Sequence, residues 1–340
     1  MCGIAGFVNF AGHDHKAALA KIRRMTDVLV HRGPDAEGFF ADDFSALGHR
    51  RLAIIDIDTG QQPMSDLGGQ IQISFNGEIY NFQQLKIELE AAGHRFHTKS
   101  DTEVILKAYI EWGEQCVERL NGMFAFAIWD ARHKRLLLAR DRVGKKPLYY
   151  QRLGDTVVFA SELKALTAHG LHPAEVDPES LDCYLTMGYI PAPRTIYSGV
   201  KKLLPAHILV IAESGNVERQ YWDLDFSNPG DIPLDQAVDE FEELLDDAVR
   251  CRMLSEVPLG AFLSGGLDSS LVVASMAKMQ YFPVLNHTIG FENTEFTEIG
   301  AARAISSHLD TNHHELIVRP HAADILEKIA WHFDEPFADS

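Results

Sequence analysis

The stretch GMFAFAIWDARHKRLLLARD, residues 122–141, decides the fold of the first part of the chain. It contains two nearly continuous apolar runs on either side of the polar segment 130–134, which is the pattern of a β-hairpin. Because polar residues do not alternate with the apolar ones, both faces of the sheet that contains this hairpin must be buried. The stretch therefore predicts a layered sandwich of antiparallel sheets flanked by helices.

The sequence around this hairpin extends the same pattern. Further strands are predicted in QIQISFNGEIYNF (70–82) and DTVVFASEL (155–163), and a second hairpin in HILVIAESGNVERQYW (207–222). The segment TEVILKAYIEWG (102–113) has the apolar spacing of a helix. We therefore expect residues 1–222 to form one domain, followed by an Asp-, Pro- and Gly-rich linker over 223–234.

Beyond the linker the pattern changes. Apolar residues at helical spacing follow Asp235, which we expect to cap the N-terminus of a helix. The strand VPLGAFL (257–263), a glycine-rich turn, the helix SSLVVASMAKM (269–279) and the strand VLNHTIGF (284–291) come next. This β-α-β order predicts that residues 235–340 form a parallel, Rossmann-like α/β domain.

Composition limits the classes of function. The chain of 340 residues has a formal net charge of -18, which argues against a broad nucleic-acid surface. It contains neither a run of ~18 apolar residues nor a secretory signal, so we expect a cytosolic protein without membrane contact. The cysteines Cys116, Cys183 and Cys251 are widely separated and are expected to be inert thiols rather than members of a disulfide framework or zinc site.

Cys2 differs from these three because it stands directly behind Met1. Removal of Met1 would place a thiol and a free α-amine on the same residue. An α-amine has an ordinary pKa of about 7.7–8.0, so a useful fraction can accept the thiol proton at neutral pH. Cys2 could equally be a small apolar residue at the start of a strand, and its position alone does not choose between the two interpretations.

Four further segments favour the nucleophile: HRGPD (31–35), GHRRLAIID (48–56), NGEIYN (76–81) and SDTEV (100–104). With the N-terminal CGIAGF they closely resemble the glutaminase domain of class II, N-terminal-nucleophile glutamine amidotransferases, and within that family the bacterial asparagine synthetases. The resemblance implies an α+β fold, a four-layer αββα sandwich. HRGPD belongs to the glutamine-loop region of the family, but its residues could equally be structural turn residues, and we leave it outside the catalytic set.

The same resemblance implies a role for each site residue. Cys2 would attack the side-chain amide of glutamine, and Asn76 and the backbone of Gly77 would stabilise the resulting oxyanion. Arg51 matches the ligand of the glutamine α-carboxylate, to which a planar guanidinium is well suited. Glu78 and Asp101 match the acceptors of the α-ammonium. The expected products are glutamate and ammonia.

A second motif, FLSGGLDSS (262–270), lies between an apolar strand and a helix. It lacks the ending of a Walker A loop, but its backbone amides at a helix N-terminus suit a phosphate or pyrophosphate. It resembles the PP-loop of ATP pyrophosphatases. This resemblance implies that Asp268 ligates Mg²⁺, that Leu263 and Ile289 border the adenosine, and that the phosphates of ATP are held by Ser264, Gly265, Gly266, Ser269 and Ser270.

Together these resemblances imply glutamine-dependent asparagine synthesis, in which ammonia attacks an aspartyl-adenylate made from ATP and yields asparagine, AMP and pyrophosphate. The chain ends at Ser340 without the second SGxGxDE-type motif of the family, so we expect an incomplete synthetase half. Two other interpretations are open. One is an amidotransferase with another acceptor, such as a carboxylate on a cell-surface sugar. The other is a non-catalytic relative that binds glutamine or nucleotide. The expected partners are small molecules, with homodimer formation open.

Overall fold

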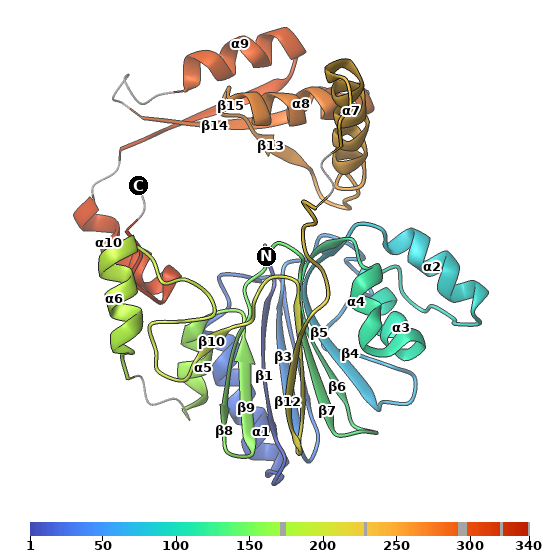
Figure 1. Ribbon diagram of the computed structural model, residues 1–340, viewed down its shortest axis with the longest axis vertical. Helices are drawn as coiled ribbons and strands as arrows, with labels where there is room; N and C mark the ends of the chain where they lie inside the picture. Colours follow the sequence, from blue (N-terminus) through green and yellow to red (C-terminus); the bar gives the residue numbers. More distant parts are fainter. Residues whose placement is uncertain (171–174, 228–229, 292–297, 320–321, 339–340) are drawn as a thin grey trace. The chain divides into compact units, whose positions relative to one another are not determined.

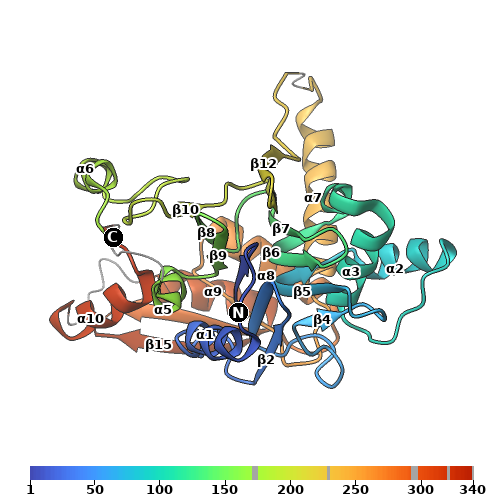
Figure 2. The ribbon, with the colours of Figure 1, turned by 90° about the horizontal axis from the view of Figure 1, so that it is seen from below.

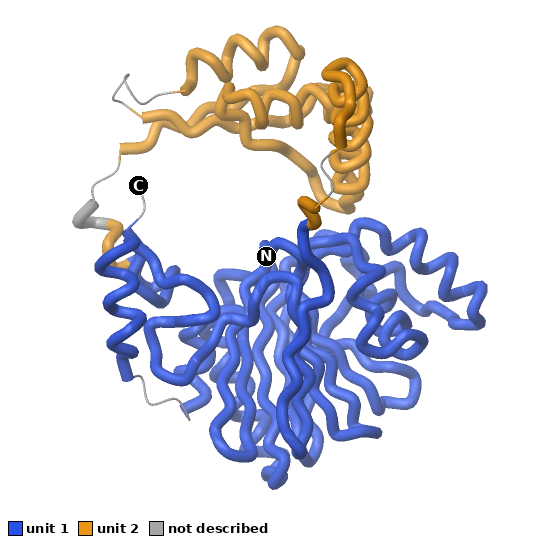
Figure 3. Tube along the Cα trace, viewed as in Figure 1, with its two compact units in different colours: residues 1–224, 328–340 blue, residues 225–327 orange. Residues whose placement is uncertain are grey.

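The computed structural model describes residues 1–170, 175–227, 230–291, 298–319 and 322–338. The chain divides into two compact units, unit 1 with residues Met1–Leu224 and Lys328–Ser340, and unit 2 with residues Asp225–Glu327 (Figure 3). Asn228 and Pro229 of the predicted linker lie outside the described residues. None of the described helices is long and apolar enough to cross a membrane.

Unit 1 contains two six-stranded sheets whose neighbouring strands are all antiparallel (Figure 1). The first sheet consists, in spatial order, of β10 (Lys201–Lys202), β8 (Tyr149–Leu153), β9 (Thr156–Ala160), β1 (Gly3–Asn9), β3 (Ser45–Arg51) and β2 (Ala36–Ala41). The second consists of β12 (Gly215–Gln220), β11 (His207–Ala212), β7 (Arg135–Arg140), β6 (Gly122–Asp130), β5 (Ile71–Ile79) and β4 (Met64–Ser65). The predicted hairpins β6-β7 and β11-β12 are confirmed.

Alternate residues of the central strands enter different layers, as the pleat requires. Ile4 of β1 and Trp129 of β6 pack between the two sheets, whereas Phe7 and Phe126 pack toward the helices outside them. Figures 1 and 2 show these helices on opposite sides of unit 1. The helices beside the first sheet are α1 (His15–Asp27) and α5 (Leu163–His169), and those beside the second are α2 (Phe82–Ala91), α3 (Asp101–Trp112) and α4 (Cys116–Arg119). The four-layer αββα order expected from the sequence is confirmed.

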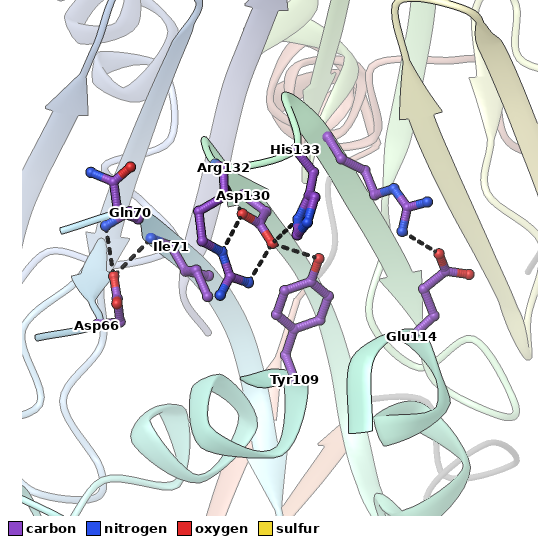
Figure 4. Close-up of polar contacts among 9 residues, drawn as sticks. Asp66, Gln70, Ile71, Tyr109, Glu114, Asp130, Arg132 and His133 are labelled. Carbon is purple, nitrogen blue, oxygen red and sulfur yellow. Dashed lines mark hydrogen bonds and ion pairs between the residues drawn. The ribbon is translucent and has the colours of Figure 1, made fainter. Parts of the chain in front are cut away.

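The turn between β6 and β7 is held by a buried carboxylate (Figure 4). Asp130 is 1% exposed, and its Oδ1 accepts a hydrogen bond from Nε of Arg132 at 2.9 Å. Its Oδ2 contacts Nη2 of Arg132 at 2.7 Å, Nδ1 of His133 at 3.1 Å and the hydroxyl of Tyr109 on α3 at 3.4 Å. The hairpin turn is therefore tied to the helix layer.

Residues 328–340 return to unit 1 after the chain has passed through unit 2. The carboxylate of Asp334 lies 3.1 Å from Nζ of Lys164 and accepts the backbone N–H of the same residue at 2.9 Å. Glu335 forms an ion pair with Lys202, and both side chains are less than 20% exposed. The backbone of Ala338 also bonds to Gly188, which follows α6 (Pro178–Met187). Buried ion pairs thus anchor this segment.

Unit 2 contains the predicted parallel sheet, in the order β13 (Gly260–Phe262), β14 (Leu285–Phe291) and β15 (Asn312–Val318). The helices are α7 (Leu234–Arg250), α8 (Leu267–Met279), α9 (Ile299–Leu309) and the first half of α10 (Ala322–Phe333). The prediction that Asp235 caps α7 is wrong. The helix begins at Leu234, two residues earlier than a cap at Asp235 predicts, with Pro233 at the cap position and Asp235 in the first turn. An acidic residue there still stabilises the helix through its dipole.

Candidate functional site

A cavity of about 130 Å³ opens in unit 1 at the ends of three strands. Cys2 precedes β1, Arg51 ends β3, and Asn76 to Glu78 lie near the end of β5. Asp101 is the first residue of α3. The cavity is lined by all six residues that the sequence assigned to the glutamine site, namely Cys2, Arg51, Asn76, Gly77, Glu78 and Asp101. Residues up to 99 positions apart in the sequence therefore meet in one place.

The thiol of Cys2 lies at the cavity wall, where the backbone N–H of Leu52 donates to Sγ at 3.4 Å. Burial raises the pKa of this thiol, and the hydrogen bonding to Leu52 partly offsets the effect. The carbonyl of Cys2 accepts a hydrogen bond of 2.9 Å from Nε of Arg32, which holds the residue from its C-terminal side. Met1 still precedes the thiol and is 55% exposed. An exposed methionine in front of Cys2 is in an accessible position for removal.

Asn76 presents a side-chain amide that no described residue satisfies. The residue is 1% exposed, yet neither Nδ2 nor Oδ1 has a hydrogen-bond partner among the described residues. An orphaned buried polar group costs about 1–3 kcal/mol, so such a group inside a cavity wall points to a ligand. Next to it, a Cβ on Gly77 would lie 2.1 Å from the carbonyl oxygen of Met123, so only glycine fits.

Two carboxylates, those of Asp101 and Glu78, also line the cavity. Asp101 is 5% exposed, and its Oδ2 accepts the backbone N–H of Ile79 at 3.0 Å. Burial, together with the neighbouring charge of Glu78, raises the pKa of Asp101 to about 7, although the hydrogen bond from Ile79 acts in the opposite direction. A cation placed between Asp101 and Glu78 would relieve this repulsion, so the pair is suited to an ammonium group.

Arg51 is also buried, but its guanidinium already holds part of the cavity wall. Nη1 donates to the carbonyl of Ile57 at 3.0 Å, and Nη2 donates to the carbonyls of Ile55 and Asp56. A Cβ on Gly60 would lie 2.6 Å from Nη2, so glycine makes room for this arrangement. Arg51 therefore organises the loop as well as lining the cavity, a role that the sequence did not predict.

The sequence missed Lys146 and left Arg32 aside. Lys146 is 5% exposed and lines the cavity with Cys2, but nothing in the pair Lys145-Lys146 shows which lysine turns inward. Arg32 lies in the HRGPD motif, which did stand out in the sequence. Its Nη1 forms a 2.8 Å ion pair with Glu162, and its Nε holds Cys2. The HRGPD motif therefore supports the backbone of Cys2 through Arg32, but none of its residues lines the cavity.

In unit 2, the glycine-rich motif forms the turn from β13 into α8. Gly265 has a φ of 82°, and a Cβ there would lie 2.5 Å from the backbone of Ala302 in α9, so glycine is required. The hydroxyls of Ser264 and Ser269 are 2.9 Å apart, and Ser270 donates to the carbonyl of Gly266 at 2.7 Å. Gly266 occupies the N-cap of α8 without a side-chain cap, which leaves backbone donors at this helix end for an anion.

Three further residues were predicted for the ATP site, Leu263, Ile289 and Asp268, and they differ in exposure. The side chain of Leu263 is 1% exposed and belongs to the core of unit 2, so only its backbone can border a nucleotide. Ile289 on β14 is 47% exposed. Asp268 stands in the first turn of α8, and no group of three or more potential metal ligands occurs among the described residues. A cation bound by Asp268 would therefore depend on oxygens of a bound phosphate.

Comparisons with known proteins match the two parts of the chain to two different families. A family model described as a glutamine amidotransferase domain matches residues 1–222, and one described as asparagine synthase matches residues 240–340. The chain is similar to asparagine synthetase [glutamine-hydrolyzing] 1 of Bacillus subtilis, with 39% identity over 100% of this chain and 54% of the relative. It is also similar to asparagine synthetase [glutamine-hydrolyzing] 3 of that organism, with 40% identity over 87% of this chain and 49% of the relative.

The chain thus spans about half the length of these curated relatives. Among solved structures, the glutamine phosphoribosylpyrophosphate amidotransferase of B. subtilis matches with a TM-score of 0.49 and 19% identity, covering 96% of this chain and 70% of that one.

Proposed function

Because the chain belongs to the family of glutamine-hydrolysing asparagine synthetases, we propose that unit 1 hydrolyses glutamine and that unit 2 contributes to an ATP-dependent transfer of the ammonia to aspartate. The single observation that carries the first half is the cavity that joins Cys2 to the orphaned amide of Asn76 and to the Asp101-Glu78 pair. We assign residues 1–222 to the glutaminase domain, 223–234 to a linker and 235–340 to the synthetase domain.

The proposed reaction begins when removal of Met1 frees the α-amine of Cys2. This amine takes the thiol proton, and the sulfur attacks the side-chain carbonyl carbon of glutamine. The tetrahedral oxyanion is stabilised by the amide of Asn76 and the N–H of Gly77. The carbon–nitrogen bond breaks as the amine returns the proton to the leaving group, which departs as ammonia. Water then cleaves the thioester, and glutamate leaves.

Charge complementarity orients the substrate in this scheme. Asp101 and Glu78 would accept the α-ammonium, since both line the cavity and the charge of Glu78 adds to burial in raising the pKa of Asp101. Arg51 would bind the α-carboxylate, with its remaining N–H groups, while it keeps its hold on the loop carbonyls.

For the second half, the donors of the loop fit a polyphosphate. Ser264, Gly265, Gly266, Ser269 and Ser270 would hold the phosphates of ATP, and the backbone of Leu263 and Ile289 would border the adenosine. Asp268 would hold Mg²⁺, which offsets phosphate charge when bound. The proposed acceptor is the aspartate side-chain carboxylate, activated as an acyl-adenylate, because the relatives are named asparagine synthetases.

Glutamate release from glutamine tests the first half. Cys2→Ala is expected to abolish it, whereas Cys183→Ala, at a half-buried free cysteine of α6, leaves it unchanged. The intact mass of the active protein should lack Met1. Persistent hydrolysis in Cys2→Ala would refute the nucleophile. For the acceptor, the measurement is ATP- and glutamine-dependent formation of asparagine from aspartate by the full-length gene product, and active hydrolysis with no asparagine would contradict the assignment.

A further inference from the structure

The turn after β7 is built around one carboxylate. Asp141 is fully buried, and its oxygens accept the backbone N–H groups of Val143 at 3.2 Å, Lys145 at 2.9 Å and Lys146 at 2.9 Å. Nε of Arg140 holds the carbonyl of Lys146 at 2.8 Å. Because the backbone N–H and the carbonyl of Lys146 are both held by hydrogen bonds, the direction in which its side chain leaves the turn is fixed as well.

This turn separates two adjacent lysines. Lys145 is exposed, whereas Lys146 is 5% exposed and lines the cavity together with Cys2 and Glu78. Burying a lysine costs free energy unless its charge has a use or a partner. Burial lowers the pKa of Lys146, and the negative charge of Glu78 partly offsets this effect.

The groups that face the N-terminal amine come from several elements. In the structure this amine belongs to Met1, and burial is the main reason that its pKa is lowered. Arg32 and Lys146 push the pKa further down, whereas the thiol of Cys2 and the carboxylate of Asp35 push it up. Around the thiol and Lys146 the additional charged groups are Arg51, Asp101, Glu78 and Asp141. Removal of Met1 moves the amine onto Cys2, which lines the same cavity as Lys146.

We propose that Lys146 is a positioning residue of the glutaminase site, whose buried ammonium keeps the α-amine of Cys2 in the neutral form that accepts the thiol proton. The inference rests on the proposed glutamine hydrolysis. Two positive charges in one cavity repel each other, so a charged Lys146 disfavours protonation of the amine. The amine must be neutral before it can take the proton from Sγ, and this requirement sets the acid limb of kcat.

The test compares Lys146→Met, which removes the charge at similar length, with Lys146→Arg, which keeps it, and with the exposed control Lys145→Met. We expect Lys146→Met to move the acid limb of kcat for glutamine hydrolysis to higher pH by roughly half to one unit, which is about a 3–10-fold loss of neutral amine. In Lys146→Arg and Lys145→Met the acid limb should lie at the same pH as in the wild-type protein.

A second readout does not depend on hydrolysis. Cyanate carbamoylates only neutral amines, and the mass of the N-terminal peptide reports the reaction at Cys2. We expect Lys146→Met to slow this carbamoylation by about 3–10-fold on the acid side. An unchanged rate and an unchanged acid limb would overturn the inference, even if Cys2→Ala confirms the glutaminase. If Lys146→Met does not fold, Lys146→Gln replaces it in both measurements. An acid limb and a carbamoylation rate that stay unchanged in Lys146→Gln overturn the inference, and the shifts expected for Lys146→Met support it.

Discussion

At the scale of single residues, the orphaned amide of Asn76 gives a direct kinetic prediction. If Nδ2 binds charge that develops only in the transition state, Asn76→Ala lowers kcat for glutamine hydrolysis by about 10²–10³-fold and changes KM little. The control is Ser74→Ala, two residues earlier on the same face of β5, which removes a hydrogen bond to Gly48 but does not line the cavity. A large rise in KM with kcat unchanged would instead mean that Asn76 serves ground-state binding.

The pKa of Asp101, about 7, gives a pH dependence of substrate binding. Above this value the carboxylate is ionised and attracts the α-ammonium of glutamine, and below it the carboxyl is neutral. We therefore expect KM for glutamine to rise as the pH falls below 7, by about tenfold per unit once protonation is complete. In Asp101→Asn, KM should be high at every pH between 5 and 8. Steady-state kinetics check this, and a wild-type KM that is constant over that range would contradict the role.

At the scale of elements, the β6-β7 turn in Figure 4 predicts a stability difference between two carboxylates. Burial alone would raise the pKa of Asp130, but the hydrogen bonds from Arg132 and His133 outweigh it and hold the pKa below its usual range. Asp130→Asn should lower the free energy of unfolding by about 1–3 kcal/mol. Glu114→Gln, which breaks an ion pair whose side chains are 31% and 41% exposed, should lower it by less than about 1 kcal/mol.

Denaturant unfolding at neutral and acid pH measures both effects. A carboxylate with a depressed pKa contributes stability above the ordinary pKa of about 3.9, and this contribution is lost as the pH falls through the folded-state value. The difference between Asp130→Asn and the unchanged protein should therefore shrink in acid. A difference that is the same at every pH would assign the effect to packing rather than to charge.

At the scale of the whole molecule, residues 328–340 should remain attached to unit 1 after the chain is cut between the units. Phe226 is 81% exposed, so a cleavage site for a specific protease inserted after it should be cut, and the two fragments should elute together in gel filtration. Removing one partner of a buried ion pair costs about 3–5 kcal/mol. The double variant Lys164→Met, Lys202→Met should therefore release the C-terminal fragment, whereas Lys201→Met, at the exposed neighbour of Lys202, should not. Separation of the fragments without any substitution would contradict this anchoring.

Much of the architecture follows from local patterns. Two apolar runs without alternation can only be buried on both faces, which is why residues 122–141 predict a covered sheet and why the layered order is found. The start of α7 shows the limit of such arguments. A proline at 233 and an aspartate at 235 are both compatible with a helix start, and the difference of two residues depends on local backbone geometry that the sequence pattern does not contain.

The sequence by itself determined the layers and the parallel sheet of unit 2, because both follow from apolar periodicity and the order of elements, whereas the six residues of the proposed glutamine site were predicted from the resemblance to the glutamine amidotransferases. Only the tertiary structure decided which of two adjacent lysines enters the cavity, what Arg51 holds and where residues 328–340 pack. The physical reason is that burial and charge pairing join residues far apart in the chain: Lys164 and Asp334 meet across 170 positions. Patterns of neighbouring residues do not predict contacts between residues that are so far apart in the sequence.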